Sequence, residues 1–247
     1  MKYKLLIAYD GTDFSGWQVQ KHAPSVAQTM QDRFKALFNR EITLIGASRT
    51  DAGVHAMGQV ATFSVDLPVD TLQMMHAWND ALPETIVIRS LEQVDDRFHP
   101  IYGVAQKVYK YRFFLERPLP FNQAYGWFFR YCLDVHLLHE ALQLFVGTHD
   151  FRSFCTGIDM GENTVRTIES IELFQENAQG SWLIIVKGPG FLRHMIRRIV
   201  GASFDVASKR RITVAKLKSI LEERDPEQAL TNAPAKGLCL ESIVYKK

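Results

Sequence analysis

The chain has 247 residues, of which 47% are hydrophobic and 23% are charged. This balance is typical of a folded globular protein and excludes an intrinsically disordered chain. No apolar run approaches the length of a membrane-spanning helix, and the net charge of +2 is too small to diagnose a nucleic-acid-binding protein by itself.

The distribution of charge is more informative than its sum. Residues 1–104 hold 9 Lys and Arg against 12 Asp and Glu, whereas residues 105–247 hold 20 against 15. The first half therefore has a net charge of −3 and the second a net charge of +5. This asymmetry predicts that a polyanionic partner binds mainly to the second half.

Cysteine and histidine patterns bear on the compartment and on metals. The three cysteines, Cys132, Cys155 and Cys239, are odd in number and widely separated, which indicates a reducing compartment rather than a disulfide framework or a zinc site. The eight histidines show no metal-ligand spacing, so no metal is predicted. Met1 to Asp10 is expected to be a strand rather than a signal peptide, which predicts a cytoplasmic protein with no membrane partner.

The first half reads as alternating strands and helices. The expected elements are strand 3–10, helix 26–39, strand 42–47, strand 59–65, helix 71–80 and strand 85–94. Ser25 and Gln28 form the capping box of the first helix, and Asp70 caps the second. The first helix has an apolar stripe made of Met30, Phe34, Leu37 and Phe38.

The second half repeats the same order with one added helix. The expected elements are strand 105–115, helix 136–146, strand 165–176, strand 182–187, helix 191–206, helix 214–223 and strand 238–245. Gly147 is the expected stop of the first helix of this half. Residues 116–123 and 155–163 have no predicted structure and are long enough to be functional loops.

Element order predicts the architecture. The order β-α-β-β-α-β occurs twice and is typical of the ferredoxin-like, or RRM-like, unit. We therefore expect an α+β fold with two halves, 1–104 and 105–247, related by pseudo-two-fold symmetry and with joined antiparallel sheets. The repeat is inferred from element order alone, because the halves show no clear sequence identity.

The first candidate site is the stretch Gly46 to Gln59, G-A-S-R-T-D-A-G-V-H-A-M-G-Q. Its glycines allow tight turns, and it presents Asp51 two residues after Arg49. Arg49 can hold the Asp51 carboxylate ionised by a charge-assisted hydrogen bond, or it can bind a phosphate. The structural alternative is that Asp51 caps a short helix beginning at Ala52, with Arg49 as its surface partner.

Two further segments carry candidate functional residues. In the strand K-V-Y-K-Y-R-F, alternation places Tyr109 on one face, where a phenol offers a flat ring and a polar tip, although most strand tyrosines only pack. Residues 181–198 end with three arginines, Arg193, Arg197 and Arg198, which follow a glycine turn. These arginines suit either a solvated helix face or phosphate binding. Arg193 stands where a dinucleotide fingerprint needs its third glycine, so that interpretation is disfavoured.

Seven short motifs are spread along nearly the whole chain. They are Y-D-G-T-D-F-S-G-W-Q from Tyr9, S-R-T-D-A-G-V-H-A from Ser48, K-V-Y-K-Y from Lys107, H-D-F from His149, V-R-T-I from Val165, G-F-L-R-H-M from Gly190 and A-K-G-L from Ala235. Together, and in this order, they resemble the TruA family of tRNA pseudouridine synthases. The most specific is S-R-T-D-A-G-V-H-A, which the family usually writes with Gly at the position of Ser48.

The resemblance implies roles for individual residues. It identifies Asp51 as the essential catalytic residue, Tyr109 as the tyrosine that stacks on the target base, and Arg197 as a neighbour of the catalytic Asp. The resemblance also places Leu238 beside the base, although a Leu that opens a strand more often belongs to the core. Because a guanidinium both stacks and binds phosphate, Arg49 is expected to steer the flipped base or to fill the vacated stack. Arg193 and Arg198, on the basic helix, are expected to bind the RNA backbone.

The activity implied by the resemblance is isomerisation of uridine to pseudouridine in tRNA without a cofactor. The family acts as a symmetric homodimer on the anticodon arm, at positions 38 to 40 of the tRNA. Asp51 attacks the ring or the sugar, or removes the 2′ proton; the sequence leaves these routes open. A non-catalytic pair of RRM-like halves would lack the RRM signature, and a nucleotide-dependent enzyme would lack a P-loop.

Overall fold

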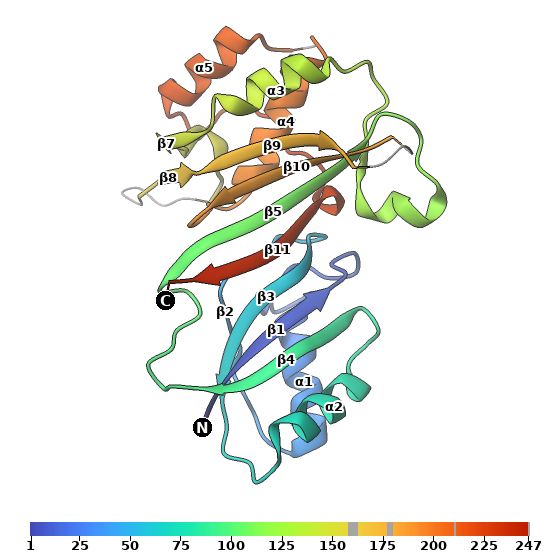
Figure 1. The fold of residues 1–247 in the computed structure, drawn as a ribbon, viewed down its shortest axis with the longest axis vertical. Helices are drawn as coiled ribbons and strands as arrows, with labels where there is room; N and C mark the ends of the chain where they lie inside the picture. The colour runs from blue at the N-terminus through green and yellow to red at the C-terminus, as the bar shows by residue number, and fades with distance from the viewer. Residues whose placement is uncertain (158–162, 177–179, 210, 247) are drawn as a thin grey trace. The chain divides into compact units, whose positions relative to one another are not determined.

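The computed structural model describes residues 1–157, 163–176, 180–209 and 211–246. Within these limits the chain divides into two compact units. Unit 1 comprises Met1–Ala105 together with Cys239–Lys247, and unit 2 comprises Gln106–Leu238. Helices and strands alternate along both units, and most of the strand pairs are antiparallel (Figure 1).

Unit 1 is a sheet in the order β4-β1-β3-β11, with the short β2 also paired to β3. Its elements are β1 (Lys2–Tyr9), α1 (Val26–Phe38), β2 (Ile45–Gly46), β3 (His55–Ser64), α2 (Thr71–Ala81), β4 (Ile86–Val94) and β11 (Leu238–Tyr245). Strand β1 runs antiparallel to both β3 and β4, whereas β11 runs parallel to β3. The first unit therefore shows the predicted β-α-β-β-α-β order before β11 is added.

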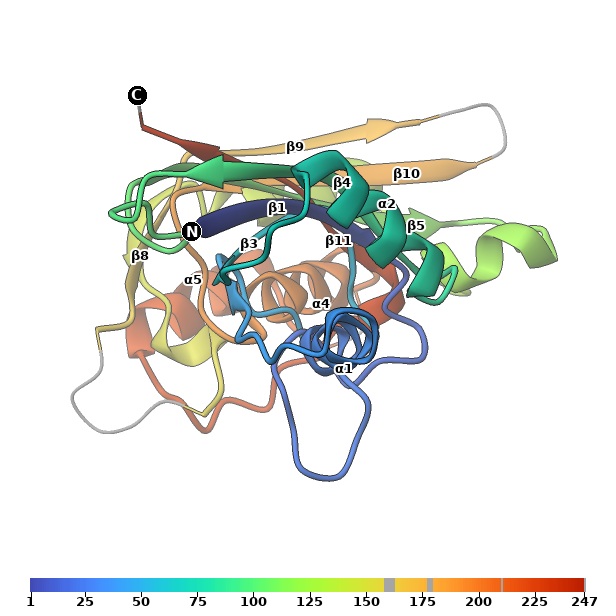
Figure 2. The same ribbon diagram turned by 90° about the horizontal axis from the view of Figure 1, so that it is seen from below.

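Helices α1 and α2 pack on one face of this sheet through aromatic side chains. Figure 2 shows α1 lying to one side of the strands of its unit. Trp78 of α2 contacts Phe34 of α1 and Phe63 of β3 edge-on, with ring centroids 4.7 and 5.5 Å apart. Its indole N–H also donates to the Met30 carbonyl at 3.1 Å. The buried face of β1 that completes this core consists of Tyr3, Leu5, Ile7 and Tyr9.

Unit 2 contains a sheet in the order β5-β10-β9, with β6 alongside β5, and a separate two-stranded sheet of β7 and β8. Its strands are β5 (Val104–Phe114), β6 (Trp127–Phe128), β7 (Gly147–Asp150), β8 (Val165–Ile168), β9 (Ser170–Gln175) and β10 (Ser181–Gly188). Its helices are α3 (Val135–Gln143), α4 (Met195–Ala207) and α5 (Val214–Glu223), with 3-10 turns η1 (Pro120–Tyr125), η2 (Arg152–Phe154) and η3 (Ala235–Gly237). Phe204 of α4 packs edge-on against Phe113 of β5, 4.9 Å between ring centroids.

Several strand predictions change in the structure. The predicted strand 42–47 reduces to β2, because the Leu44 N–H donates to the side chain of Gln31 at 2.8 Å. The predicted strand 165–176 is two strands, since β8 pairs with β7 whereas β9 pairs with β10. Residues 116–123 overlap the turn η1, and the predicted loop 155–163 lies partly outside the described residues.

The helix predictions change at their ends. Leu37, assigned to the buried stripe of α1, is exposed. Ser25 caps α1 by accepting from the Gln28 N–H, but the Gln28 side chain donates to Asp32 instead of completing the capping box. Helix α3 ends at Gln143, four residues before Gly147. Asp70 caps α2 as predicted, accepting two backbone N–H groups.

The C-terminal strand lies in unit 1 and not with the residues that precede it. Cys239 and Leu240 pair with the start of β3. The Tyr245 hydroxyl donates to the Pro100 carbonyl at 2.7 Å, and its ring packs against Phe98. Burial of this phenol raises its pKa. The compact units therefore differ from the halves 1–104 and 105–247, because Cys239–Lys247 belongs to unit 1. No described helix has both the length and the apolar character to cross a membrane.

Candidate active site

Asp51 lies in the loop between β2 and β3, within unit 1. Its side chain is half-buried, between the exposed Arg49 and the buried Val54. The Val54 N–H donates to the Asp51 carbonyl at 3.1 Å, which closes a turn. No helix begins at Ala52, so Asp51 is not the cap of a helix here. The loop therefore presents a carboxylate and a guanidinium close together in sequence, on a short and tightly bonded stretch of backbone.

The segment from Tyr9 to Trp17 holds this loop in place by hydrogen bonds. The Tyr9 hydroxyl and Thr50 Oγ1 form a buried hydrogen bond of 2.7 Å, in which either group donates. The Trp17 N–H donates to the Thr50 carbonyl at 3.2 Å, and the Gly53 N–H donates to the Phe14 carbonyl at 3.1 Å. The backbone on both sides of Asp51 is therefore bonded to this segment.

Two glycines make this close approach possible. A Cβ on Gly11 would overlap the Val54 carbonyl, and a Cβ on Gly16 would overlap the Thr50 carbonyl. Gly16 also has a φ of 99°, in the region that favours glycine. The run Y-D-G-T-D-F-S-G-W-Q is therefore the support of the Asp51 loop, a role that sequence reasoning alone did not assign to it.

Gln59 of β3 holds the other end of the loop. Its side-chain Nε2 donates to the Ser48 carbonyl at 2.6 Å, and its Oε1 accepts from the Ser48 N–H at 3.2 Å. Both contacts use the main chain of residue 48, and Ser48 has no positive φ. The serine at this position, where the family usually has Gly, therefore leaves these two hydrogen bonds intact.

His55 begins β3 directly behind the loop. Its Nδ1 lies 3.1 Å from the Gly11 N–H and also 3.1 Å from the Asp10 carboxylate. One nitrogen cannot accept a proton and donate one at the same time. We favour acceptance from Gly11, because a backbone N–H always carries its proton whereas Nδ1 needs protonation to donate.

Tyr109 lies on β5 in unit 2 and is buried, on the strand face that alternation predicted it to share with Lys107 and Tyr111. Its ring meets Phe191 edge-on, 5.4 Å between centroids. Lys107 lies two residues earlier on the strand, opposite Gly188 of β10. Burial lowers the pKa of the Lys107 ammonium to about 8. This face of β5 therefore combines an aromatic ring with a desolvated cation.

Tyr111 and Arg197 jointly anchor the segment that leads to Leu238. The Tyr111 hydroxyl donates to the Pro234 carbonyl at 3.0 Å, and Arg197 Nε donates to the neighbouring Ala233 carbonyl at 2.8 Å. Burial raises the pKa of Tyr111 well above its ordinary value, and the positive charge of Arg197 opposes that rise. Leu238, which follows η3, is itself buried.

The three candidate arginines of the basic segment differ in their surroundings. Helix α4 begins at Met195 rather than at residue 191, because His194 adopts a left-handed conformation with a φ of 62°. Arg193 therefore precedes the helix, and it is exposed. Arg198 is half-buried, and its Nη1 donates to the carbonyls of Ser153 and Cys155 at 3.2 and 3.1 Å. Burial lowers the pKa of this guanidinium.

The predicted site residues thus form two groups, one in each unit. Arg49 and Asp51 share the loop of unit 1, and Arg197 lies beside Tyr111 in unit 2. The residues that sequence reasoning missed are the supports Tyr9, Trp17, Thr50 and Gln59. The sequence around a polar side chain does not predict which distant residue it bonds to across the sheet. The motif beginning at Tyr9 nevertheless identified this part of the chain.

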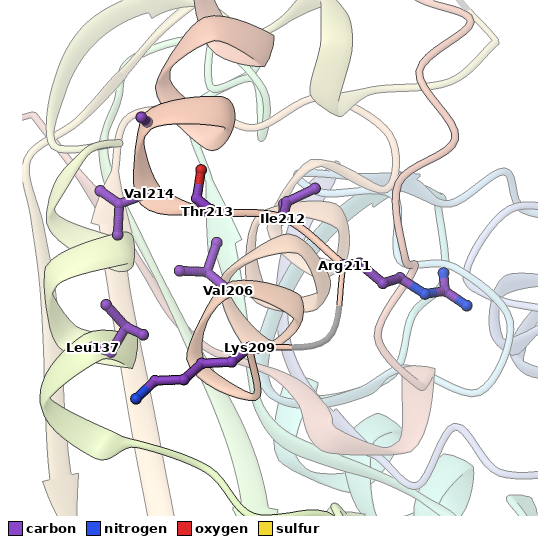
Figure 3. A pocket seen from close by; sticks show the side chains of 8 residues that line it. Leu137, Val206, Lys209, Arg211, Ile212, Thr213 and Val214 are labelled. Atoms are coloured by element: carbon purple, nitrogen blue, oxygen red, sulfur yellow. The ribbon is translucent and has the colours of Figure 1, made fainter.

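A pocket of about 490 Å³ lies elsewhere in unit 2, between α3 and the segment that joins α4 to α5 (Figure 3). Its lining includes the apolar Leu137, Val206 and Ile212 together with the basic Lys209 and Arg211. None of the predicted site residues lines it, and Lys209 is 3.9 Å from the Asp134 carboxylate. The described residues contain no cluster of three or more His, Cys, Asp or Glu side chains suited to a metal.

Comparison with known proteins identifies the family. A family model described as tRNA pseudouridine synthase matches residues 5–103 and 141–246. The tRNA pseudouridine synthase A 1 of Protochlamydia amoebophila is 39% identical over 249 residues, which is 99% of this chain and 96% of that protein. The tRNA pseudouridine synthase A of Thermodesulfovibrio yellowstonii is 36% identical over 252 residues, 98% of each chain.

Among solved structures, an archaeal box H/ACA Nop10–Cbf5 complex is similar over 94% of this chain and 58% of that chain, with 12% identity and a TM-score of 0.32. A likeness this weak supports no argument about the site. The family model and the near full-length relatives are sufficient on their own. The chain belongs to the TruA family of tRNA pseudouridine synthases.

Proposed function

We propose that this protein isomerises uridine to pseudouridine in tRNA and that Asp51 is its catalytic carboxylate. The reaction breaks the bond between N1 of uracil and C1′ of the ribose, rotates the base, and joins C1′ to C5. The C5 hydrogen is released as a proton, and N1 gains one. Substrate and product have the same atoms and oxidation state, so the reaction requires no external oxidant, reductant or group donor.

The observation that carries the proposal is the support of the Asp51 loop on two sides. Hydrogen bonds from Trp17 and Gln59 fix the backbone before Asp51, and the bond from Gly53 fixes it after. Catalytic groups need such fixed placement, because small errors of position lower the rate steeply. Family membership supports a role for this carboxylate in catalysis of the isomerisation. Attack on the ring, attack on the sugar and removal of the 2′ proton all remain routes for it.

The other candidate residues are assigned by the family resemblance and by their chemistry. The resemblance assigns Tyr109 to stacking on the target base; its ring is held edge-on against Phe191, and Lys107 adds positive charge to the same strand face. Arg49 is exposed and steers the flipped base or fills its place in the stack. Enzymes that react at a base extract it from the stack, which explains the need for such a residue.

The arginines of unit 2 have two kinds of role, binding of the RNA backbone and support of neighbouring segments of the chain. Exposed Arg193 binds the RNA backbone, whereas Arg198 holds η2 through two backbone carbonyls. Arg197 fixes the segment leading to Leu238, the residue that the family resemblance assigns to the lining of the base pocket. Arg197 is half-buried and Leu238 is buried, a setting that suits a role in shaping a pocket rather than in binding phosphate.

We infer that the two halves are related as ferredoxin-like units with a pseudo-two-fold axis. The β-α-β-β-α-β order of unit 1 supports this, as does the order β4-β1-β3-β2 of its strands. We also propose that the enzyme is a cytoplasmic homodimer that acts on the anticodon arm. The net charge of +5 in the second half supports binding of a polyanion there.

The test is to incubate the pure protein with an unmodified tRNA transcript without added metal or nucleotide. Base-resolution mapping of pseudouridine should then show product in the anticodon arm. Sedimentation at the assay concentration should give a dimer. A protein that binds tRNA but forms no pseudouridine would be an RNA-binding protein only, and product confined to another arm would refute the assigned substrate site.

A further inference from the structure

We infer that Tyr9 and Gln59 are positioning residues that set the location of Asp51 for catalysis, an inference that rests on the proposed function. Neither side chain belongs to the loop that carries the carboxylate. Tyr9 ends β1 and Gln59 lies within β3, and both are buried. Each bonds to a loop residue within three positions of Asp51.

The Tyr9 contact acts directly next to the carboxylate. Its hydroxyl is bonded to Oγ1 of Thr50, the residue before Asp51, and both side chains are buried. The Tyr9 ring is held in turn by stacking on Trp17, 6.1 Å between centroids. Because the ring and the hydroxyl partner are both fixed, the bond restrains Thr50 through its side chain, independently of the backbone bond from Trp17.

The Gln59 contact restrains the opposite end of the loop. A single amide satisfies both the N–H and the carbonyl of Ser48, in the way that a neighbouring strand would. It thereby fixes both the position and the plane of the backbone three residues before Asp51. Gln59 has no exposed surface, so solvent does not compete for either bond.

The two contacts together restrain the backbone of the loop, which its glycines do not. Glycine permits close approach but leaves the backbone free to move. Fixed side-chain bonds at Ser48 and Thr50 remove that freedom around the intervening Arg49. We therefore expect loss of either bond to shift Asp51 while leaving the surface that binds RNA in place.

The chain supplies a matched control for each contact. Tyr3 is on the same strand and the same buried face as Tyr9, but its hydroxyl faces the Met1 sulfur at 3.5 Å. Asn79 makes the same two-point amide contact as Gln59, with the N–H and carbonyl of Ile88 at 2.8 and 2.9 Å. Each control removes the same chemical group at a place outside the loop.

The first experiment compares Tyr9→Phe with Tyr3→Phe, and Gln59→Glu with Asn79→Asp. We expect Tyr9→Phe and Gln59→Glu to lower the single-turnover rate of pseudouridine formation by about tenfold or more, with little change in tRNA affinity. The control variants should keep the wild-type rate. Equal rates for Tyr9→Phe and Tyr3→Phe, or losses confined to tRNA affinity, would overturn the inference.

A second readout does not depend on activity. Amide hydrogen exchange of residues 48–54 should accelerate in Tyr9→Phe and remain unchanged in Tyr3→Phe, and Thr50→Val should reproduce the effect without adding to it in the double variant. Unchanged exchange in Tyr9→Phe would overturn the positioning role. If the wild-type protein forms no pseudouridine, the proposed function fails, while the exchange data still decide whether Tyr9 orders the loop.

Discussion

Arg198 and Cys155 are joined by a hydrogen bond from guanidinium Nη1 to the backbone carbonyl, 3.1 Å long. The same nitrogen donates to the Ser153 carbonyl, so one side chain of α4 fixes both ends of the segment from Ser153 to Cys155. Burial also raises the pKa of the Cys155 thiol to about 11, which keeps it protonated and unreactive at neutral pH. Arg198, which the sequence groups with Arg193 as a candidate for binding the RNA backbone, thus also links two elements of unit 2.

Arg198→Met is expected to lower the free energy of unfolding by about 1–3 kcal/mol, because two backbone carbonyls lose a charged donor. Arg193→Gln should leave stability unchanged and reduce the salt dependence of tRNA binding by about one unit of slope. Chemical denaturation and tRNA titrations at several salt concentrations measure the two effects. Loss of tRNA affinity in Arg198→Met at full stability would restore this residue to the RNA-binding surface.

Asp51→Asn is expected to abolish pseudouridine formation, with a loss of several orders of magnitude, since it removes the carboxylate that we propose as catalytic while keeping the size of the side chain. The thermal midpoint and tRNA affinity should stay near wild type, because Asp51 is only half-buried. Exposed Asp66, which follows β3, provides the control: Asp66→Asn should be fully active. Activity of Asp51→Asn within a few-fold of wild type would exclude a catalytic role.

Tyr109→Phe is expected to bind tRNA normally but to turn over slowly if the hydroxyl moves a proton. Tyr109→Ala should also weaken tRNA binding by about 1–3 kcal/mol, because a base-stacking surface is lost. Tyr111→Phe is the comparison, since its hydroxyl donates to Pro234; that variant should lose about 0.5–1.5 kcal/mol of stability. Wild-type kinetics in Tyr109→Phe would restrict Tyr109 to stacking.

Lys107 predicts a pH dependence of stability. Its pKa is about 8 in the folded protein, against 10.5 for an ordinary lysine, so between these values the unfolded chain binds more protons. Stability should therefore rise with pH across this window, and the burial penalty should be present in full below about pH 8. Lys107→Met removes the penalty, so it should be more stable than wild type at about pH 7 and lose that advantage near pH 10. Denaturation of both proteins at the two pH values measures the difference, and a constant offset would contradict it.

Local sequence signals predicted the elements that depend on local interactions. Strand 238–245 and helix 214–223 were predicted at their observed bounds, and Asp70 was identified as a cap from its own position. These features depend on periodicity and on hydrogen bonds between near neighbours. The family motif likewise identified the Asp51 loop, although periodicity did not reveal that β3 begins as early as His55.

Features that depend on distant partners were not predictable in this way. Helix α4 begins late because His194 is held outside it, with Nδ1 2.6 Å from Thr156 Oγ1, and Thr156 lies far away in sequence. The strand break at Glu169 reflects a change of partner rather than a turn signal. The Tyr9 and Gln59 contacts cross the sheet for the same reason, and no single-sequence pattern records them.

The position of β11 also constrains how the protein folds as it is synthesised. A ribosome makes β1, β3 and the Asp51 loop first, yet Cys239 and Leu240, which pair with the first residues of β3, emerge only after all of unit 2. The edge of β3 next to the loop is therefore without this partner strand while the intervening residues are translated. Closure of the edge requires pairing between residues 184 positions apart, since Cys239 pairs with His55 and Leu240 with Ala56, and such long-range pairings form slowly. The candidate active site is consequently among the last parts of unit 1 to reach its final structure.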